Sequence, residues 1–271
     1  MGEHFDKALI FTDLHIVPEG ETIIGLDPAE RFAEGLAHAL ARHPDAQHLI
    51  LLGDLVHTGR QAEYDRLAPL LADCPIPVSV TMGNHDHRER LAATFPGALD
   101  RNGFVQRALD LGPLRLLILD TFDYEDRAPL EHDGWLCATR LAWLDAELAR
   151  AAADGKSVVV MCHHPPCPVG FWAMDAIGLA NAHDLLDRLH AAPHVRHLIC
   201  GHIHHACMRE IADIQYINTG DWVESCTAVI EDADGELRLV DWEARHNRQR
   251  MLERRTRRRS REASKKQREL Q

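Results

Sequence analysis

Five short groups of imidazole, carboxylate and amide side chains stand out because each follows an apolar run. The groups are Asp13-x-His15, Asp54 after Gly53, Gly83-Asn84-His85-Asp86, His163-His164-Pro165-Pro166 and Gly201-His202-x-His204. Carboxylate, imidazole and one amide oxygen, without thiolate, suit divalent ions such as Mn, Fe, Zn or Co rather than a structural tetrahedral zinc. One such group alone is more often a cap or a turn. All five in one chain predict a metal site.

The apolar runs before these groups predict buried strands, and apolar residues at helical spacing predict the helices that connect them. Strands are expected at 8–11, 48–52, 76–82, 115–120, 157–162 and 197–200. Helices are expected at 28–42, 61–72, 136–152 and 182–192, with Asp27 as the N-cap of the first. This alternation is typical of parallel crossover units, whose loops gather at the carboxyl ends of the strands. The five groups should therefore lie together.

The pattern changes after Gly201. Three consecutive strands are expected at 215–218, 226–231 and 236–242, in a second sheet with mainly antiparallel pairing. Residues 244–271 carry 12 Lys and Arg against 3 Asp and Glu, whereas the whole chain has a net charge of −12. We expect one domain at 1–243 and a basic tail at 244–271, either helical or disordered. Weak contact of this tail with an anionic membrane or nucleic acid is the functional alternative to a solvated tail.

Composition limits the class of protein. The chain has 271 residues with 45% apolar content, enough for one large core, and no run of about 18 apolar residues that would span a membrane. The amino-terminal residues lack a basic stretch followed by an apolar one, so a cytoplasmic location is expected. The seven cysteines are odd in number and never spaced C-x-x-C, which indicates reduced thiols rather than a disulfide framework.

The order and spacing of the five groups resemble the calcineurin-like metallophosphoesterase family over roughly residues 8–205. The resemblance implies an α/β fold, a four-layer αββα sandwich of two mixed β-sheets flanked by helices. It also implies two divalent ions with seven ligands: Asp13, His15 and His204 for one ion, Asn84, His163 and His202 for the other, and Asp54 as the bridge. His163 is preferred to His164 because the family's ligand precedes x-Pro.

The resemblance gives His85 a role without metal contact, because the family's histidine at this place stabilises the transition state or protonates the leaving oxygen. The implied mechanism is attack on phosphorus by a hydroxide that bridges the two ions. Many relatives have an acidic residue three positions after the bridging Asp, where this chain has His57. Either another acid such as Asp86 supports His85, or His85 acts without one.

Two parts of the chain resemble different branches of that family. The segments around Gly25-Leu26-Asp27-Pro28 and His163-His164-Pro165-Pro166 resemble class III cyclic nucleotide phosphodiesterases and their glycerophosphodiesterase relatives. Segment 201–242 resembles UDP-2,3-diacylglucosamine diphosphatase-like members. We therefore expect hydrolysis of a small-molecule phosphodiester, with a nucleotide-sugar or lipid-linked pyrophosphate as the alternative.

Three further expectations concern binding and assembly. Phe171 and Trp172 either stack a base at the pocket mouth or close the core beneath their loop. A homo-oligomer is possible. A non-catalytic scaffold is disfavoured because every expected ligand is present.

Overall fold

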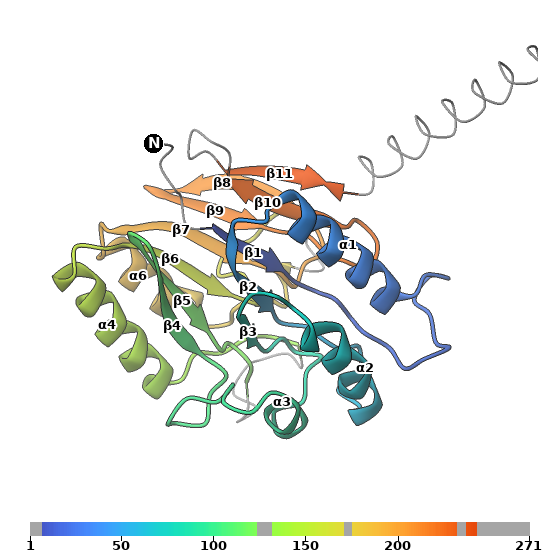
Figure 1. Ribbon diagram of the computed structural model, residues 1–271. Helices are drawn as coiled ribbons and strands as arrows, with labels where there is room; N and C mark the ends of the chain where they lie inside the picture. The colour runs from blue at the N-terminus through green and yellow to red at the C-terminus, as the bar shows by residue number, and fades with distance from the viewer. Residues whose placement is uncertain (1–6, 124–131, 171–174, 232–236, 243–271) are drawn as a thin grey trace, which may run out of the picture.

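The computed structural model describes residues 7–123, 132–170, 175–231 and 237–242. Two main sheets flanked by helices confirm the expected sandwich (Figure 1). The smaller sheet is parallel throughout, in the order β1 (Lys7–Phe11), β2 (Ala46–Leu52), β3 (Val78–Thr81). The larger sheet is mixed, in the order β4 (Arg107–Leu111), β5 (Leu114–Leu119), β6 (Ser157–Cys162), β7 (Val195–Cys200), β9 (Ile214–Asn218), β8 (Cys207–Ile211).

Helices cover the outer face of each sheet (Figure 1). The helices on the side of the smaller sheet are α1 (Pro28–Arg42), α2 (Gln61–Ala72) and α3 (Arg88–Thr94). The larger sheet is covered by α4 (Ala138–Ala153) and α6 (Ala182–His190). Asp27 caps α1 as expected, because its side chain accepts hydrogen bonds from the backbone N–H groups of Ala29 and Glu30.

Three apolar cores separate the four layers, and strand β2 shows how they arise. Leu49 and Leu51 pack beneath the helices of the smaller sheet, whereas Ile50 and Leu52 pack between the two sheets. Successive side chains of a strand point to opposite faces, so a strand buried on both faces is a continuous apolar run. The sandwich therefore explains why an apolar run precedes each of the five groups of candidate metal ligands.

The carboxyl-terminal strands differ from expectation. β9 does not join a second sheet but pairs in parallel with β7, because the β8–β9 hairpin turns back onto the larger sheet. Only β10 (Thr227–Glu231) and β11 (Leu237–Asp241) form a separate antiparallel pair. Two further predictions, the basic tail at 244–271 and the placement of Phe171 and Trp172, lie outside the described residues.

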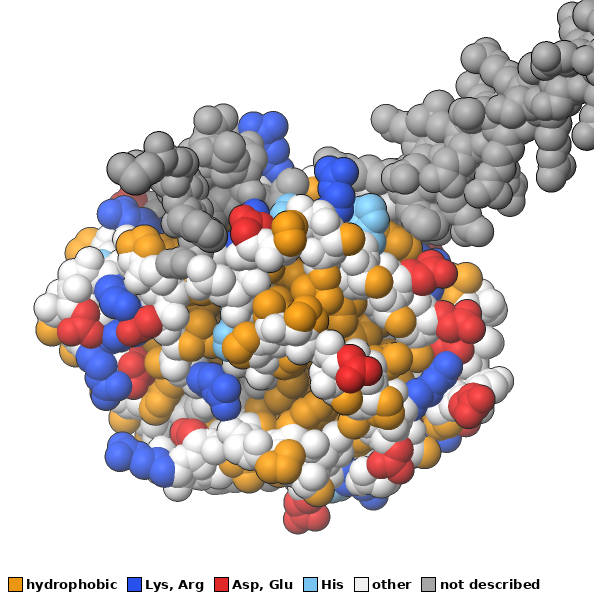
Figure 2. Space-filling model, viewed as in Figure 1, with side chains coloured by type: hydrophobic (Ala, Val, Ile, Leu, Met, Phe, Trp, Pro, Cys, Tyr) orange, Lys and Arg blue, Asp and Glu red, His pale blue; other side chains and the backbone are white. Residues whose placement is uncertain are grey.

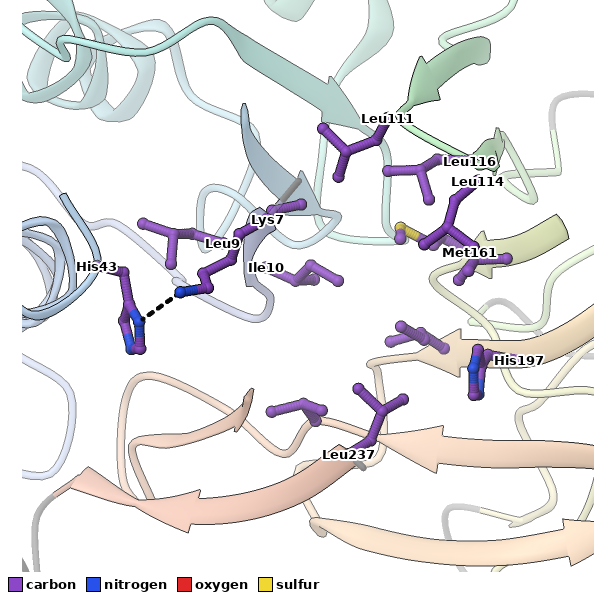
Figure 3. A pocket seen from close by; sticks show the side chains of 14 residues that line it. Lys7, Leu9, Ile10, His43, Leu111, Leu114, Leu116, Met161, His197 and Leu237 are labelled. Carbon is purple, nitrogen blue, oxygen red and sulfur yellow. Dashed lines mark hydrogen bonds between the residues drawn. The ribbon is translucent and has the colours of Figure 1, made fainter. Parts of the chain in front are cut away.

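An apolar hollow of about 140 Å³ lies between the sheets, towards the amino-terminal ends of β1 and β5 (Figure 3). Lys7 and His43 lie at one side of it, with Lys7 Nζ 3.5 Å from His43 Nδ1. Figure 2 shows apolar side chains gathered at the middle of the face viewed there, with charged side chains around them. The five groups of candidate metal ligands follow the carboxyl ends of the strands, so the hollow lies apart from these ligands.

All seven cysteines are free, and Cys162 and Cys200 are core residues beneath α4 and α6. Among the described residues, no helix is long and apolar enough to cross a membrane.

Candidate dinuclear metal centre

The carboxyl ends of β1, β2 and β3 meet those of β6 and β7, and this brings the predicted ligands together. Three groups have ligand atoms within 4.8 Å of one another: Asp13, His15, Asp54 and His204; His163, His164 and His202; His15, His57 and His85. All six Asp and His residues predicted as ligands belong to these groups. Two segments almost 200 residues apart thus share one site.

In the first group, the imidazoles and carboxylates point at a common centre. His15 Nε2 lies 3.0 Å from His204 Nε2, and His204 Nε2 lies 3.2 Å from Asp13 Oδ1. Thr12 donates a hydrogen bond of 2.6 Å to Asp13 Oδ2, which fixes the carboxylate. Converging lone pairs at this spacing are the arrangement that a cation stabilises.

Asp54 lies between the first group and the second. Its Oδ2 is 3.7 Å from His15 Nε2 and 3.2 Å from His163 Nε2. The other nitrogen of His163, Nδ1, donates to the carbonyl of Leu52 at 3.0 Å. Metal-binding histidines commonly donate their second N–H to a carbonyl in this way, which fixes the ring. The position of Asp54 is therefore that of a carboxylate able to bridge two ions.

The second group also contains His164 and His202. His202 donates from Nε2 to the carbonyl of Ile177 at 2.7 Å, which leaves Nδ1 as its ligand atom. His164 Nδ1 lies 2.8 Å from Thr121 Oγ1. Since His163 has the contact with Asp54, the geometry favours it over His164 as the ligand.

Asn84 provides a direct test of whether the site suits a cation. Its Oδ1 is buried and has no hydrogen-bond partner within the described part of the chain, whereas its Nδ2 lies 3.1 Å from His132 Nδ1. A buried carbonyl oxygen without a partner costs about 1–3 kcal/mol, so such an atom usually has a ligand. A divalent ion would provide that partner. The donor set therefore fits divalent ions, and the Asn84 oxygen would be one of their ligands.

The ring of His85 is held by a backbone carbonyl rather than by a carboxylate. Ring Nδ1 of His85 donates to the carbonyl of His57 at 2.6 Å, and the backbone N–H of His85 donates to Asp54 Oδ1 at 2.9 Å. Asp86 instead accepts hydrogen bonds from Gly83 N, Leu55 N and Tyr64 Oη. The backbone carbonyl of His57 thus orients His85, and Asp86 orients the loops around it.

The backbone at the site is strained. Five of the predicted ligands have positive φ: Asp13 (53°), His15 (45°), Asp54 (48°), His202 (74°) and His204 (53°). Such conformations cost on the order of 1–3 kcal/mol each and persist only where the surroundings enforce them. Backbone hydrogen bonds between loops do so, including His15 N to Asp54 O at 3.0 Å. A Cβ on Gly83 would lie 2.1 Å from Asp54 Oδ1, so that glycine allows the close approach.

The four ring nitrogens that face the centre differ in basicity. Burial lowers the pKa of both His15 and His202 to about 4. Burial also disfavours the charged forms of His163 and His204, but the adjacent carboxylates outweigh it. Asp54 and Asp13 raise the pKa of His163 to about 10, and the hydrogen bond with Asp13 raises that of His204 to about 9. Without metal, these two histidines hold protons at neutral pH.

Metal uptake should therefore release protons. At pH 7.5, binding of two Mn ions should release about two protons per chain, one each from His163 and His204, because only neutral imidazole binds metal. Affinity should rise with pH until it passes the pKa values of about 9 and 10. Titration calorimetry in buffers of different ionisation enthalpy measures the number released. Heats that do not depend on the buffer would contradict this assignment.

Sequence reasoning missed two contributors. Thr12 orients Asp13, and His132 contacts Asn84, but neither belongs to a motif. Thr12 could have been noticed because it directly precedes Asp13. His132 stands alone in an irregular segment, and only the folded chain brings it to the site.

Comparison with known proteins agrees with this geometry. Residues 7–206 match the family described as calcineurin-like phosphoesterase. A probable cyclic nucleotide phosphodiesterase of Rhodopseudomonas palustris is 40% identical over 199 residues, 73% of this chain and 71% of the relative. The glycerophosphodiester phosphodiesterase GpdQ of Enterobacter lignolyticus is 32% identical over 177 residues, 64% of this chain and 60% of the relative. A dimetal phosphatase structure from Danio rerio shares the fold, with a TM-score of 0.68, 18% identity and coverage of 88% of this chain and 99% of that one.

These matches confirm the resemblance on which the sequence interpretation depended. They also confirm the expected enzyme class, a metal-dependent phosphoric diester hydrolase. The family match covers most of the chain, and the match to the relative from Rhodopseudomonas palustris covers 73% of it. The chain belongs to the calcineurin-like phosphoesterase family.

Proposed function

We propose that this chain hydrolyses 3′,5′-cyclic nucleotides or glycerophosphodiesters at a centre that holds two ions among Mn, Fe, Zn and Co. The observation that carries the proposal is the place of Asp54, between His15 and His163 and hydrogen-bonded to the backbone of His85. The names of the relatives support the choice of substrates: cyclic nucleotide phosphodiesterases and a glycerophosphodiester phosphodiesterase.

The chain's own residues have separate tasks in this proposal. When bound, two divalent ions supply positive charge for the phosphoryl oxygens and make water acidic near neutral pH, which permits the hydroxide mechanism. Asp13 is oriented by Thr12 and by the N–H of His202, 3.1 Å from each carboxylate oxygen. His85 has one ring nitrogen held by the carbonyl of His57, so the other is available to protonate the departing alkoxide.

The test is hydrolysis of cyclic AMP by purified, Mn-reconstituted protein, with the product identified. Asn84→Ala removes a proposed ligand, and His183→Ala, whose side chain is 76% exposed on α6, is the matched control. The proposal predicts AMP as product, loss of turnover in Asn84→Ala and full turnover in His183→Ala. Glycerophosphocholine is tested in parallel, because the proposal admits either class of substrate.

The other outcomes separate the alternatives. Cleavage of UDP-2,3-diacylglucosamine, with neither phosphodiester cleaved, would establish the pyrophosphatase alternative. Two bound ions with no cleavage of any of these substrates would refute the proposed reaction. A chain that binds no metal would favour a scaffold.

A further inference from the structure

His132 lies outside all five motifs, in the segment between β5 and α4, yet it contacts two residues of the candidate centre. Its Nδ1 is 3.1 Å from Asn84 Nδ2, and its ring lies beside that of His85. We infer that His132 is a positioning residue, which holds the Asn84 amide with its oxygen towards the metal centre and limits the movement of the His85 ring. The inference rests on the two-ion centre of the proposed function.

The orientation of the Asn84 amide determines which of its atoms can face a cation. An amide can bind a cation only through its oxygen, and a rotation of 180° about its last bond would present N–H groups instead. Asn84 Nδ2 lies 3.1 Å from His132 Nδ1 and donates to it when the imidazole proton is on Nε2, so that tautomer of His132 favours the observed orientation. Asn84 Oδ1 is buried and accepts no hydrogen bond from any residue that the structure describes, so no such bond to the oxygen selects the orientation. The contact with His132 therefore occupies the amide nitrogen of Asn84 and leaves the oxygen as the atom available to a cation.

His132 also contacts the ring of His85. That ring is stacked with two nearly parallel imidazoles, that of His57 at a centroid distance of 5.6 Å and an interplanar angle of 13°, and that of His132 at 5.9 Å and 6°. The bond from His85 Nδ1 to the carbonyl of His57 fixes one edge of the ring. The flanking rings restrict its tilt. His132 is itself exposed, so it occupies the solvent side of this stack.

Backbone hydrogen bonds close to His132 hold it in place. Two residues further on, Gly134 donates a hydrogen bond to Gly178 O and accepts one from Ala180 N, each at 2.9 Å. A Cβ on Gly134 would lie 2.6 Å from the ring of His164, so this segment packs directly on the His163-His164 loop. Gly134, two residues from His132, is thus packed against the loop that provides His163 and His164.

The test measures the two successive steps of Mn binding. Each step is measured by titration and by the EPR spectrum of coupled Mn pairs. His132→Ala should weaken one of the two binding steps about 10- to 100-fold, the usual effect of removing a partner of a metal ligand, and leave the other step unchanged. His132→Gln, whose Oε1 can accept the same hydrogen bond, should recover most of the loss. His183→Ala should bind as the unaltered chain does. The exposed place of His132 leaves the cores intact in both variants.

A double-variant cycle with Asn84→Ala makes the test specific. If His132 acts through Asn84, the double variant with Asn84→Ala and His132→Ala should bind Mn no more weakly than the Asn84→Ala variant alone. Wild-type affinity in His132→Ala, or losses that add fully in the pair, would overturn the inference. These readouts need no substrate. A chain that cleaves no phosphodiester but shows the cycle refutes only the proposed reaction, and an active chain without the cycle refutes only the role of His132.

Discussion

Asp54→Asn should reduce phosphodiester hydrolysis by about a thousandfold or more, because loss of metal charge at the transition state costs several kcal/mol. Asp54 is fully buried between His15 and His163, so the substitution removes the one negative charge shared by both groups of ligands. The neutral amide would also present an N–H where an oxygen must face a cation. At most one ion should remain tightly bound.

Steady-state kinetics and metal analysis of the same preparation check this expectation. Asp73→Asn, at the exposed end of α2, is the matched control and should retain two ions and full turnover. An Asp54→Asn protein with two tightly bound ions and more than about a tenth of the turnover would show that Asp54 does not bridge them.

His85→Ala should lower kcat by about 10²–10⁴ for substrates with an alkoxide leaving group, the usual contribution of a general acid. The loss should be small for an aryl phosphodiester that releases nitrophenolate, because that oxygen departs without a proton. Metal content should be unchanged, since the structure gives His85 a backbone contact with Asp54 and a ring bond to the carbonyl of His57.

The comparison of leaving groups is the decisive measurement. An equal loss with alkoxide and nitrophenolate would assign His85 to charge stabilisation instead of proton donation. An unchanged rate with both would remove it from the mechanism. His87→Ala, two residues further along the same loop, controls for disturbance of the backbone.

The strands and ligand loops were predictable because a strand that is buried on both faces is a continuous apolar run in the sequence. Val158, Val160 and Cys162 face α4 and α6, and Val159 and Met161 face the other sheet, so β6 is apolar throughout. The polar group after such a run must lie at the edge of the sheet. This reasoning identified the position of each candidate ligand but not the distances between them.

The division into two sheets was not visible in the residues, because all the buried runs are alike. β4 and β8 were missed for the opposite reason, since each is only partly buried and has no apolar run. The group that orients the ring of His85 was also not predictable from the sequence. It is the backbone carbonyl of His57, and every residue type carries that group.

The separation of His15 and His204 by 189 positions has a consequence for synthesis and folding. A nascent chain that ends before β7 lacks one of the proposed donors of each ion, and no local contact can replace them. Contacts this distant in sequence form late because long loops must close first. Full metal loading can therefore occur only after β7 has docked, so retained metal would report that β7 and the loop after it are in place.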